Sequence, residues 1–325
     1  MNLEHSVTRS AYGIVPIPVA VIANGESPSA LLMAGGHGDE YEGQIVLSKL
    51  VRSIQPQDIR GRLIILPAAN LPAALAGVRV SPLDAGNLNR AFPGSPVGGP
   101  TARIADLVAT VLMPLCDVFV DLHSGGTSLN YLVHAYAELS GDETLDCRRR
   151  AALAAFNVPI SVPVLVGGRK GLAAEVALDR RMISISGEFG GGGTVSAEGI
   201  RAAERGVNRL LAHLGMIALS EEWQPEIETR VMQVDRSMYV YAPEVGIFEP
   251  TCKLGEEVVL GSLAGYLHFP ENPTRPPTSI RFQASGLVVC LCALGRVARG
   301  DCLGHLFADA APSSPPVPQT SNKTD

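Results

Sequence analysis

Apolar residues in the first two thirds of the chain form short runs that alternate with longer stretches of helical periodicity. The short runs, which predict buried strands, are 19–23, 29–36, 61–68, 116–123 and 181–188. The stretches with helical spacing are 42–54, 101–115, 145–156 and 197–214. Buried strands separated by helices are typical of an α/β fold. We therefore expect a catalytic domain over residues 1–215, built on a largely parallel or mixed sheet flanked by helices.

The pattern changes near residue 225, where short β-like runs between glycine turns replace the helical spacing. Two segments there share one order of residues: 246–267, GIFEPTCKLGEEVVLGSLAGYL, and 286–306, GLVVCLCALGRVARGDCLGHL. The repeat predicts a small β-rich domain over 225–309, similar to the barrel sandwich of biotinyl and lipoyl domains. Lys253 lies outside the turn that carries the modified lysine in those domains, so we expect no carrier role. Residues 310–325 are rich in proline and serine and are predicted to be disordered.

Composition excludes several classes of protein. The 325 residues are 46% hydrophobic and 18% charged, with a net charge of −6, so the basic surface that nucleic acid or an anionic membrane requires is not expected. The first ten residues lack a signal-peptide pattern, and no apolar run is long enough to span a membrane. Six cysteines without paired C-x-x-C spacing indicate reduced thiols in a cytoplasmic protein. The sequence leaves homo-oligomerisation open.

The segment AGGHGDEYEG, 34–43, places a histidine and a glutamate three residues apart between a predicted strand and a predicted helix. His37 and Glu40 would face one side of the helix start, where they could bind one ion, or they could belong to a turn and helix cap. A second H-x-x-E match, from His268 to Glu271, lies among prolines in the β-rich region and is interpreted as chance. The position of His37 is more informative, because ligands collect at the carboxyl ends of strands in α/β sheets.

Other predicted strands end in polar residues of the same kind. His123 and Glu188 each close a strand, and Asn70 follows another. Two histidines and one glutamate can bind zinc and leave a fourth position for water. A further carboxylate is what metal-assisted hydrolysis needs to move a proton. A single buried histidine is usually structural, but several such strand ends together favour a metal-dependent hydrolase.

The same segments resemble a known family. HGDEYEG, NLPAALAGVR, NLNRAFPG, DLHSGG and EFGGGG occur in the order found in the succinylglutamate desuccinylase and aspartoacylase family, relatives of the zinc carboxypeptidases. The resemblance covers the whole predicted catalytic region, and the β-rich region fits the accessory domain of the family. Within the family, the segments are most similar to the branch that deacetylates N-acetyl-2,4-diaminobutyrate in ectoine breakdown. The resemblance implies a zinc-carboxypeptidase-like fold and a small N-acyl amino acid as substrate.

The resemblance also implies roles for individual residues. His37, Glu40 and His123 would hold one Zn²⁺ per subunit, and Glu188 would act as general base and then general acid. Arg79 matches the position that stabilises the oxyanion, a task that suits a fixed cation. Asn89 and Arg90 match the pair that binds the substrate carboxylate, for which the planar guanidinium fork is suited.

Two further features have a functional and a structural interpretation. Asp121 shares a strand face with His123 and would either orient that histidine or face water. The glycines 190–193 would either let the backbone approach the substrate closely or form only a flexible turn.

Alternative functions remain at this point. The enzyme could instead deacylate N-acyl-aspartate or N-succinyl-glutamate, or act as a carboxypeptidase on small peptides. A metal-binding protein without turnover is a third alternative, against which the intact Glu188 argues. The glycine motifs of nucleotide-binding proteins are missing from the sequence. The GDCLG segment, 300–304, imitates a nucleophile elbow but lacks the strand and helix that such an elbow joins.

Overall fold

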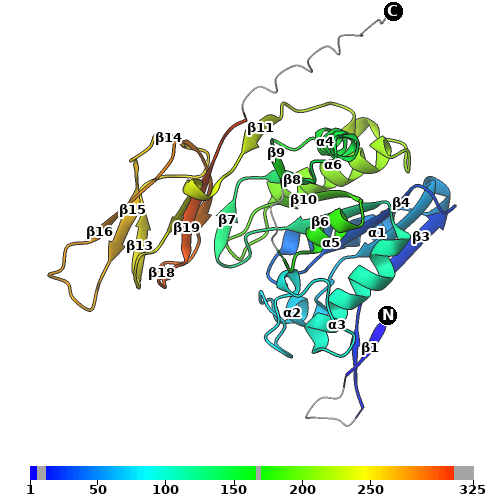
Figure 1. Cartoon of the computed structure of the whole chain (residues 1–325), viewed down its shortest axis with the longest axis horizontal. Helices are drawn as coiled ribbons and strands as arrows, with labels where there is room; N and C mark the ends of the chain where they lie inside the picture. The colour runs from blue at the N-terminus through cyan, green and yellow to red at the C-terminus, as the bar shows by residue number, and fades with distance from the viewer. Residues whose placement is uncertain (6–11, 166–169, 311–325) are drawn as a thin grey trace, which may run out of the picture.

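The computed structural model describes residues 1–5, 12–165 and 170–310 (Figure 1). The predicted disorder of the tail concerns residues that lie outside this part of the chain, except for Ala310. Within the described ranges, no helix is both long and apolar enough to cross a membrane.

A large mixed sheet forms the centre of the molecule. Its main path among the described residues runs β14-β17-β19-β11-β9-β8-β10-β6-β4-β5-β3. The neighbours β5, β4, β6 and β10 are parallel, while β3 and β8 run antiparallel to β5 and β10. The predicted mixed α/β architecture is therefore confirmed. The strands of this part are β3 (Ala20–Asn24), β4 (Ser29–Ala34), β5 (Gly61–Leu66), β6 (Val118–His123), β8 (His134–Leu139), β9 (Ile160–Leu165) and β10 (Ile183–Glu188).

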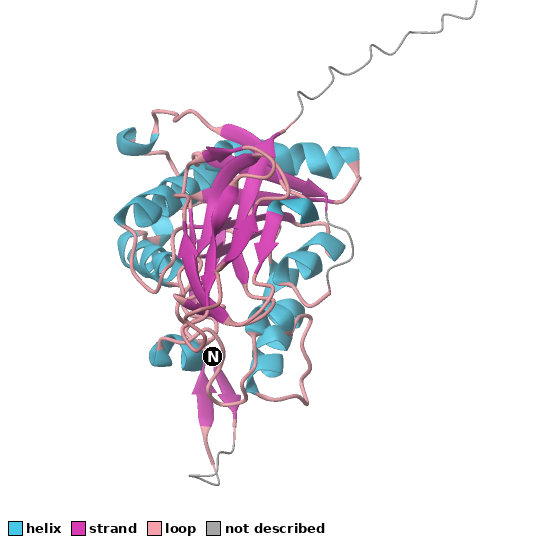
Figure 2. Cartoon of the chain, turned by 90° about the vertical axis from the view of Figure 1, so that its left-hand side faces the viewer, coloured by secondary structure: helices cyan, strands magenta, loops and turns pink. Residues whose placement is uncertain are grey.

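Helices cover both faces of this sheet (Figure 2). The core of one face takes its helical residues from α1 (Tyr41–Ser53), α4 (Glu143–Phe156) and α6 (Ala197–His213). The core of the other face takes them from α3 (Pro100–Asp106), α5 (Ala173–Asp179) and the π-helical turns Leu107–Leu112. Strand β6 shows why both faces are covered: Val118 and Val120 lie in the first core and Phe119 in the second. On the side of β6 that carries Phe119, the next two side chains toward the end of the strand are the polar residues Asp121 and His123.

The predicted helices are present with small differences at their ends. The exception is 101–115, where the α-helix ends at Asp106 and the chain continues in π-helical and then 3-10 turns, η4 (Met113–Leu115). The periodicity did not predict β8 and β9. The sequence of β8, HAYAEL, carries polar residues on one face, so it lacks the continuous apolar run of the other central strands.

The repeat in the β-rich region forms two interlocked units. The first contains β13 (Gly246–Pro250), β14 (Glu257–Val258) and β15 (Leu263–His268), and the second contains β17 (Gly286–Cys292), β18 (Arg296–Val297) and β19 (Cys302–Asp309). In each unit the first strand pairs with the third, and the short middle strand pairs with the other unit, β14 with β17 and β18 with β13. A further strand, β16 (Thr278–Arg281), pairs with β15. This exchange produces the barrel-sandwich-like arrangement that the repeat predicts.

Pairing across the predicted domain boundary joins the β-rich region to the central sheet (Figure 1). β11 (Arg230–Gln233) pairs with β9 on one side and β19 on the other, and β7 (Leu129–Tyr131) pairs with β17. β12 (Tyr239–Tyr241) also pairs with β19. The boundaries at residues 215 and 225 stay predictions, because these pairings cross the boundary and do not mark where one region ends.

Two buried histidines lie in the joint between the two regions. The His134 ring packs against Phe307 with centroids 5.0 Å apart, and the His305 ring packs against Tyr131 at 5.4 Å. His134 Nδ1 donates to the carbonyl of Leu132 at 2.8 Å, and its Nε2 accepts from the Tyr136 hydroxyl at 2.8 Å, so the neutral ring is fully bonded. Burial lowers the pKa of His134 to about 4 and that of His305 to about 3.

These histidines predict a loss of stability in mild acid. An unfolded histidine has a pKa of about 6.5, so below that pH the unfolded chain binds more protons than the folded one. The free energy of unfolding should therefore fall as the pH drops from 7 to 5, by about 2 kcal/mol for each histidine. Urea denaturation at the two pH values measures the loss. The His134→Gln variant should lose less stability on acidification than the wild type, and an equal loss would contradict this account.

Candidate active site

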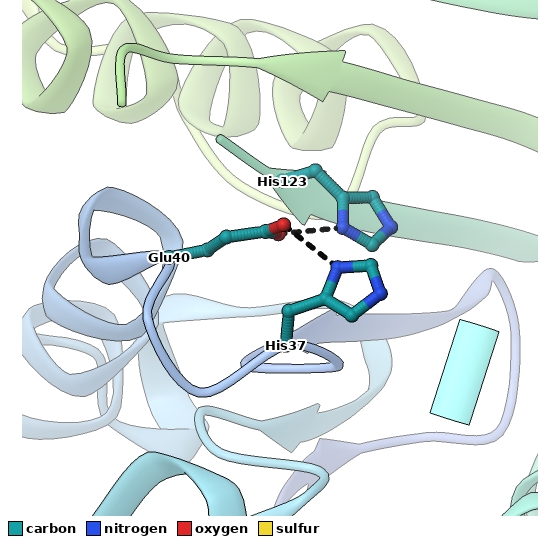
Figure 3. Close-up of side chains that lie close together, drawn as sticks. All are labelled: His37, Glu40 and His123. Carbon is teal, nitrogen blue, oxygen red and sulfur yellow. Dashed lines mark hydrogen bonds and ion pairs between the residues drawn. The ribbon is translucent and has the colours of Figure 1, made fainter. Parts of the chain in front are cut away.

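The candidate residues lie at the carboxyl ends of three adjacent strands. His37 follows β4, His123 ends β6 and Glu188 ends β10. His123 and Glu188 are direct partners in the register of β6 and β10, so their side chains leave the same edge of the sheet. Glu40 occupies the N-cap position of α1 and reaches the space between the two histidines (Figure 3). The predicted convergence at the strand ends is confirmed.

Both histidine rings direct the same nitrogen at Glu40 (Figure 3). His37 Nδ1 lies 2.7 Å from Glu40 Oε1, and His123 Nδ1 lies 2.8 Å from Glu40 Oε2. One ligand atom from each of the three residues lies within 4.8 Å of the others, and all three residues are buried. The structure thus forms a His–Glu–His group that could hold a metal ion.

The outer nitrogens of both rings are occupied. His37 Nε2 lies 3.0 Å from Asn87 Oδ1, and His123 Nε2 lies 3.0 Å from Asp121 Oδ2. If each Nε2 carries the hydrogen and donates it to these oxygens, each Nδ1 presents a lone pair toward Glu40. That arrangement suits a cation between the three residues, because oxygen partners of this kind fix the orientation of ligand histidines. This contact of Asp121 with His123 agrees with the first of the two interpretations of Asp121, in which it orients that histidine.

Charges within the group shift its ionisation strongly. Although burial alone would raise the pKa of Glu40, His123 and His37 hold that pKa well below its ordinary range. Burial likewise opposes a charge on His123, but the carboxylates of Asp121 and Glu40 raise the pKa of this histidine well above its ordinary value. Such a set favours positive charge at its centre, which a metal ion can supply in place of protons.

Arg79 reaches the same carboxylate from another segment. Its Nη1 lies 3.2 Å from Glu40 Oε1, and 40% of its side chain is exposed. Close packing at Gly38 allows this approach, because a Cβ there would lie 2.0 Å from the backbone of Ala73. The amide of Gly38 also donates to the carbonyl of Val78, the residue before Arg79, at 3.0 Å. The glycine between His37 and Asp39 therefore positions the arginine.

Asn89 lies beside His123, and Arg90 follows it in the chain. Asn89 Nδ2 is 3.2 Å from His123 Nε2, and Asn89 Oδ1 accepts from the backbone of Ala173, the first residue of α5. Arg90 is exposed and donates to the carbonyl of Asn89 at 2.5 Å. The structure thus brings Asn89 to the histidine group, and Arg90 follows it at the surface.

Glu188 is held beside this group. Its Oε2 is buried and has no hydrogen-bond partner within the described part of the chain. Burial and the negative charge of Glu40 raise the pKa of Glu188 to about 8. A carboxyl group with such a pKa can both hold and release a proton near neutral pH, which is the property of a general acid–base catalyst.

The glycine run after Glu188 forms a tightly packed turn. All four residues, 190–193, have positive φ, from 69° to 140°. The carbonyl of Gly190 accepts from the amide of Gly125 at 3.0 Å, and a Cβ on Gly191 would lie 2.1 Å from the Leu129 carbonyl oxygen. These contacts pack the turn against the loop that follows His123, and the approach of the backbone to a substrate stays a prediction.

Three residues that support the site had no predicted role. Asn87 contacts His37, and it precedes Asn89 by two residues in the segment GNLNR. Asp39 accepts from the Thr127 amide at 2.8 Å, and the fully buried Glu42 accepts from the Ser124 hydroxyl at 2.5 Å. These acids tie the start of α1 to the loop after His123. The only signal for them was the density of acids in HGDEYEG.

Comparisons with known proteins agree with this geometry. The model of the succinylglutamate desuccinylase/aspartoacylase catalytic domain matches residues 26–214. The N-alpha-acetyl-L-2,4-diaminobutyric acid deacetylase of Halomonas elongata is 36% identical over 304 residues, which cover 93% of this chain and 89% of that protein. The chain therefore belongs to the succinylglutamate desuccinylase/aspartoacylase family. It is a hydrolase that acts on amide bonds, as the resemblance in the sequence implied.

Solved structures give the same result for the fold. The product-bound ectoine utilization protein EutE (DoeB) of Ruegeria pomeroyi has a TM-score of 0.90 and 37% identity, covering 94% of this chain and 93% of its own. A succinylglutamate desuccinylase/aspartoacylase of Rhodobacter sphaeroides has a TM-score of 0.89 and 36% identity, covering 95% and 94%. The similarity extends through the β-rich region, because both relatives are covered nearly to their full length.

Proposed function

We propose that this protein deacetylates N-acetyl-2,4-diaminobutyrate, using one Zn²⁺ per subunit held by His37, Glu40 and His123. The observation that carries the proposal is the convergence of both Nδ1 atoms on the Glu40 carboxylate, with Glu188 at the neighbouring strand end. The name of the Halomonas elongata relative supports the choice of substrate.

The donor set fits zinc. Two imidazole nitrogens and one carboxylate form the kind of three-ligand site that zinc hydrolases use, with a fourth position open to water. When bound, Zn²⁺ acts as a Lewis acid and lowers the pKa of a coordinated water to about 7. Asn87 and Asp121 would keep the ligand rings in orientation, because each contacts an outer nitrogen.

Residues of the chain would transfer the proton, stabilise the oxyanion and bind the substrate carboxylate. Glu188 takes the proton of the attacking water and returns it to the leaving nitrogen, which its pKa of about 8 permits near neutral pH. Arg79 stabilises the negative charge that develops on the acetyl carbonyl oxygen. Asn89 and Arg90 bind the α-carboxylate and so fix the scissile bond relative to Glu188.

A substrate panel tests the proposal. Initial rates of the zinc-loaded protein are measured on N-acetyl-2,4-diaminobutyrate, N-acetyl-aspartate, N-succinyl-glutamate and a short peptide. The first compound is expected to give the highest kcat/KM. Preference for either diacid would overturn the proposed substrate and leave the assignment as an amide hydrolase intact. Preference for the peptide would indicate a carboxypeptidase.

Substitution of Arg90 tests how the substrate is held. Arg90→Ala should lower kcat/KM at least about 10-fold, because a charge-assisted hydrogen bond contributes roughly 1.5–3 kcal/mol. Arg90→Lys should restore little, since lysine lacks the planar fork that binds a carboxylate with two parallel bonds. Steady-state kinetics measures both effects, with Arg201→Ala as a control because Arg201 lies on α6 and pairs with Glu222. Full recovery by lysine would indicate that only charge is needed.

We further propose that the β-rich region shapes access to the site and carries no cofactor. Its strand β17 pairs with β7, which follows the loop after His123, so the two regions meet close to the metal ligands. Mass spectrometry of the intact protein should find no lipoyl or biotinyl group on Lys253. Such an adduct would refute this role.

The proposal includes a cytoplasmic location. All six cysteines are free thiols in the structure. Free thiols are typical of proteins kept in a reducing compartment.

A further inference from the structure

A buried acid that the proposed mechanism does not use lies close to the metal ligands in the chain. Glu42, in the first turn of α1, is fully buried and follows Glu40 by two residues. Both of its carboxylate oxygens accept a hydrogen bond, Oε2 from the Ser124 hydroxyl at 2.5 Å and Oε1 from the Ser196 amide at 2.8 Å. The donors lie 82 and 154 residues away in the sequence, so one side chain joins three distant segments. A buried carboxylate is costly unless donors meet it, so its place here requires an explanation.

Each of the three segments carries a residue of the proposed mechanism. The first is the start of α1, where the ligand Glu40 is the N-cap. The second is the loop after β6, because Ser124 directly follows His123. The third is the loop that begins after Glu188 at the end of β10 and ends at Ser196, the N-cap of α6. The buried acid therefore connects both sides of the metal group to the loop behind the general base.

The acid also packs closely against the backbone that follows Glu188. Gly190 has a φ of 137°, and a Cβ there would lie 2.9 Å from Glu42 Oε1. The carbonyl of Gly190 accepts from the amide of Gly125 at 3.0 Å and from that of Tyr131 at 3.2 Å. The backbone two residues beyond Glu188 is therefore fixed between the Glu42 carboxylate and the loop that contains Gly125.

The neighbouring acid Asp39 shows what Glu42 adds. Asp39 Oδ2 accepts from the amide of Thr127 at 2.8 Å and from its hydroxyl at 2.9 Å, so Asp39 already ties the start of α1 to the loop after His123. Glu42 makes a second link to that loop and adds the link to the loop after Glu188. The two acids therefore differ in the segment that carries the general base.

We propose that Glu42 is a positioning residue, which holds the loop after Glu188 against the metal ligands and so fixes the placement of the general base. The inference rests on the proposed function and deepens it, because the proton transfer assigned to Glu188 requires a defined geometry. The parallel pairing of β10 with β6 ends at Glu188 itself, so the chain beyond it depends on contacts such as those of Glu42. A displacement of about 1 Å at a reacting group can lower the rate about 10²-fold, so a small shift of the loop is sufficient.

Two substitutions of Glu42 test this role in opposite directions. Glu42→Gln keeps both contacts, because the amide oxygen can accept from the Ser196 amide and the NH₂ group can donate to the Ser124 hydroxyl oxygen. Glu42→Ala removes both contacts and frees the loop after Glu188. The glutamine variant should therefore behave as the wild type, and the alanine variant should not.

Steady-state kinetics of the zinc-loaded variants on N-acetyl-2,4-diaminobutyrate measures the effect. Glu42→Ala should lower kcat about 10- to 100-fold, and Glu42→Gln should keep kcat within about threefold of the wild type. KM of Glu42→Ala should change less than about threefold, because Asn89 and Arg90 lie on another segment. Zinc content should stay that of the wild type, since each ligand histidine keeps the oxygen partner of its outer nitrogen.

Asp117 supplies a matched control at the opposite edge of the sheet. It lies directly before β6, and its Oδ2 accepts from the amide of Ser29 at 3.2 Å and from the Ser29 hydroxyl at 2.7 Å. Asp117→Ala thus removes the same two kinds of hydrogen bond, one from a main-chain amide and one from a serine hydroxyl, away from the site. It should leave kcat unchanged. An equal fall of kcat in Asp117→Ala and Glu42→Ala would contradict a positioning role.

Hydrogen exchange of the metal-free protein tests the link without zinc or substrate. Residues 189–196 lie between β10 and α6, and their peptides in the wild type should exchange about as slowly as those of β10. Glu42→Ala should raise the exchange rate of this loop at least about tenfold, and Glu42→Gln should not. Exchange of the wild-type loop within seconds, as for an unanchored loop, would overturn the link.

The outcomes separate this inference from the proposed function. If Glu42→Ala keeps the kcat of the wild type, the positioning role is wrong and the deacetylase stands. Loss of zinc from Glu42→Ala would also overturn the role, because the acid would then hold the ligands and not the base. Should Glu42→Ala fail to fold, Ser124→Ala removes a single oxygen and should lower kcat at least about threefold, the effect of one ordinary hydrogen bond; an unchanged kcat there would contradict the role. Absence of deacetylation by the wild type would overturn the proposed function, whereas the exchange of the loop would still report the link.

Discussion

Replacing Glu188 with glutamine is expected to lower kcat about 10²–10⁴-fold, the usual contribution of general acid–base catalysis. Glutamine keeps the size of the side chain but cannot accept the proton of the attacking water. His37, Glu40 and His123 lie on other segments than β10, so zinc content should stay that of the wild type. Steady-state kinetics on N-acetyl-2,4-diaminobutyrate, with metal analysis of the same samples, measures both quantities.

A surface glutamate provides the control for this substitution. Glu204 on α6 pairs with Lys49 at 2.6 Å, and Glu204→Gln should leave kcat unchanged. A loss of less than about tenfold in Glu188→Gln would place the general base elsewhere. Loss of zinc from Glu188→Gln would instead mean that this residue is a ligand.

Replacing His123 with alanine should abolish activity through loss of the metal. The substitution removes one of three protein donors and leaves Glu40 with one histidine partner. Zinc affinity should therefore fall by at least about 100-fold, which is more than the loss expected when a residue that only orients a ligand is removed. Equilibrium dialysis against zinc measures the affinity, and acetate release measures the activity.

The second H-x-x-E segment supplies a matched control for the histidine. His268 is partly exposed and pairs with Glu249 on β13 at 2.6 Å, as an ordinary surface contact. His268→Ala should therefore keep both zinc and activity. If His123→Ala bound stoichiometric zinc and turned over normally, the assignment of ligands would be wrong.

Local sequence patterns were sufficient to predict that these side chains gather at one edge of the sheet. The apolar runs that end in His123 and Glu188 are buried strands with a polar last residue, and the parallel register of β6 and β10 makes those residues neighbours. The context of His37, between a strand and a helix, likewise separated it from His268. These features depend on spacing within a few residues, which the sequence shows directly.

Contacts between distant segments were not predictable in the same way. Asn87 and His37 are 50 residues apart, and nothing in GNLNR indicates which of its two asparagines meets the ring. Glu42 belongs to a segment rich in acids, and nothing in that segment indicates that its side chain meets Ser124 and Ser196. The pairing of β7 with β17 depends equally on tertiary structure, because neither strand carries a signal for its partner.

Titration of the metal-free protein with Zn²⁺, followed by acetate release from N-acetyl-2,4-diaminobutyrate, tests the central claim most directly. Activity should be absent after chelation, rise linearly with added zinc and reach its maximum at one ion per chain. The His37→Ala protein should show no rise over the same range, since it lacks one of the three donors at Glu40. Full acetate release by the chelated wild type, or an equal rise in His37→Ala, would contradict hydrolysis at the His37–Glu40–His123 group.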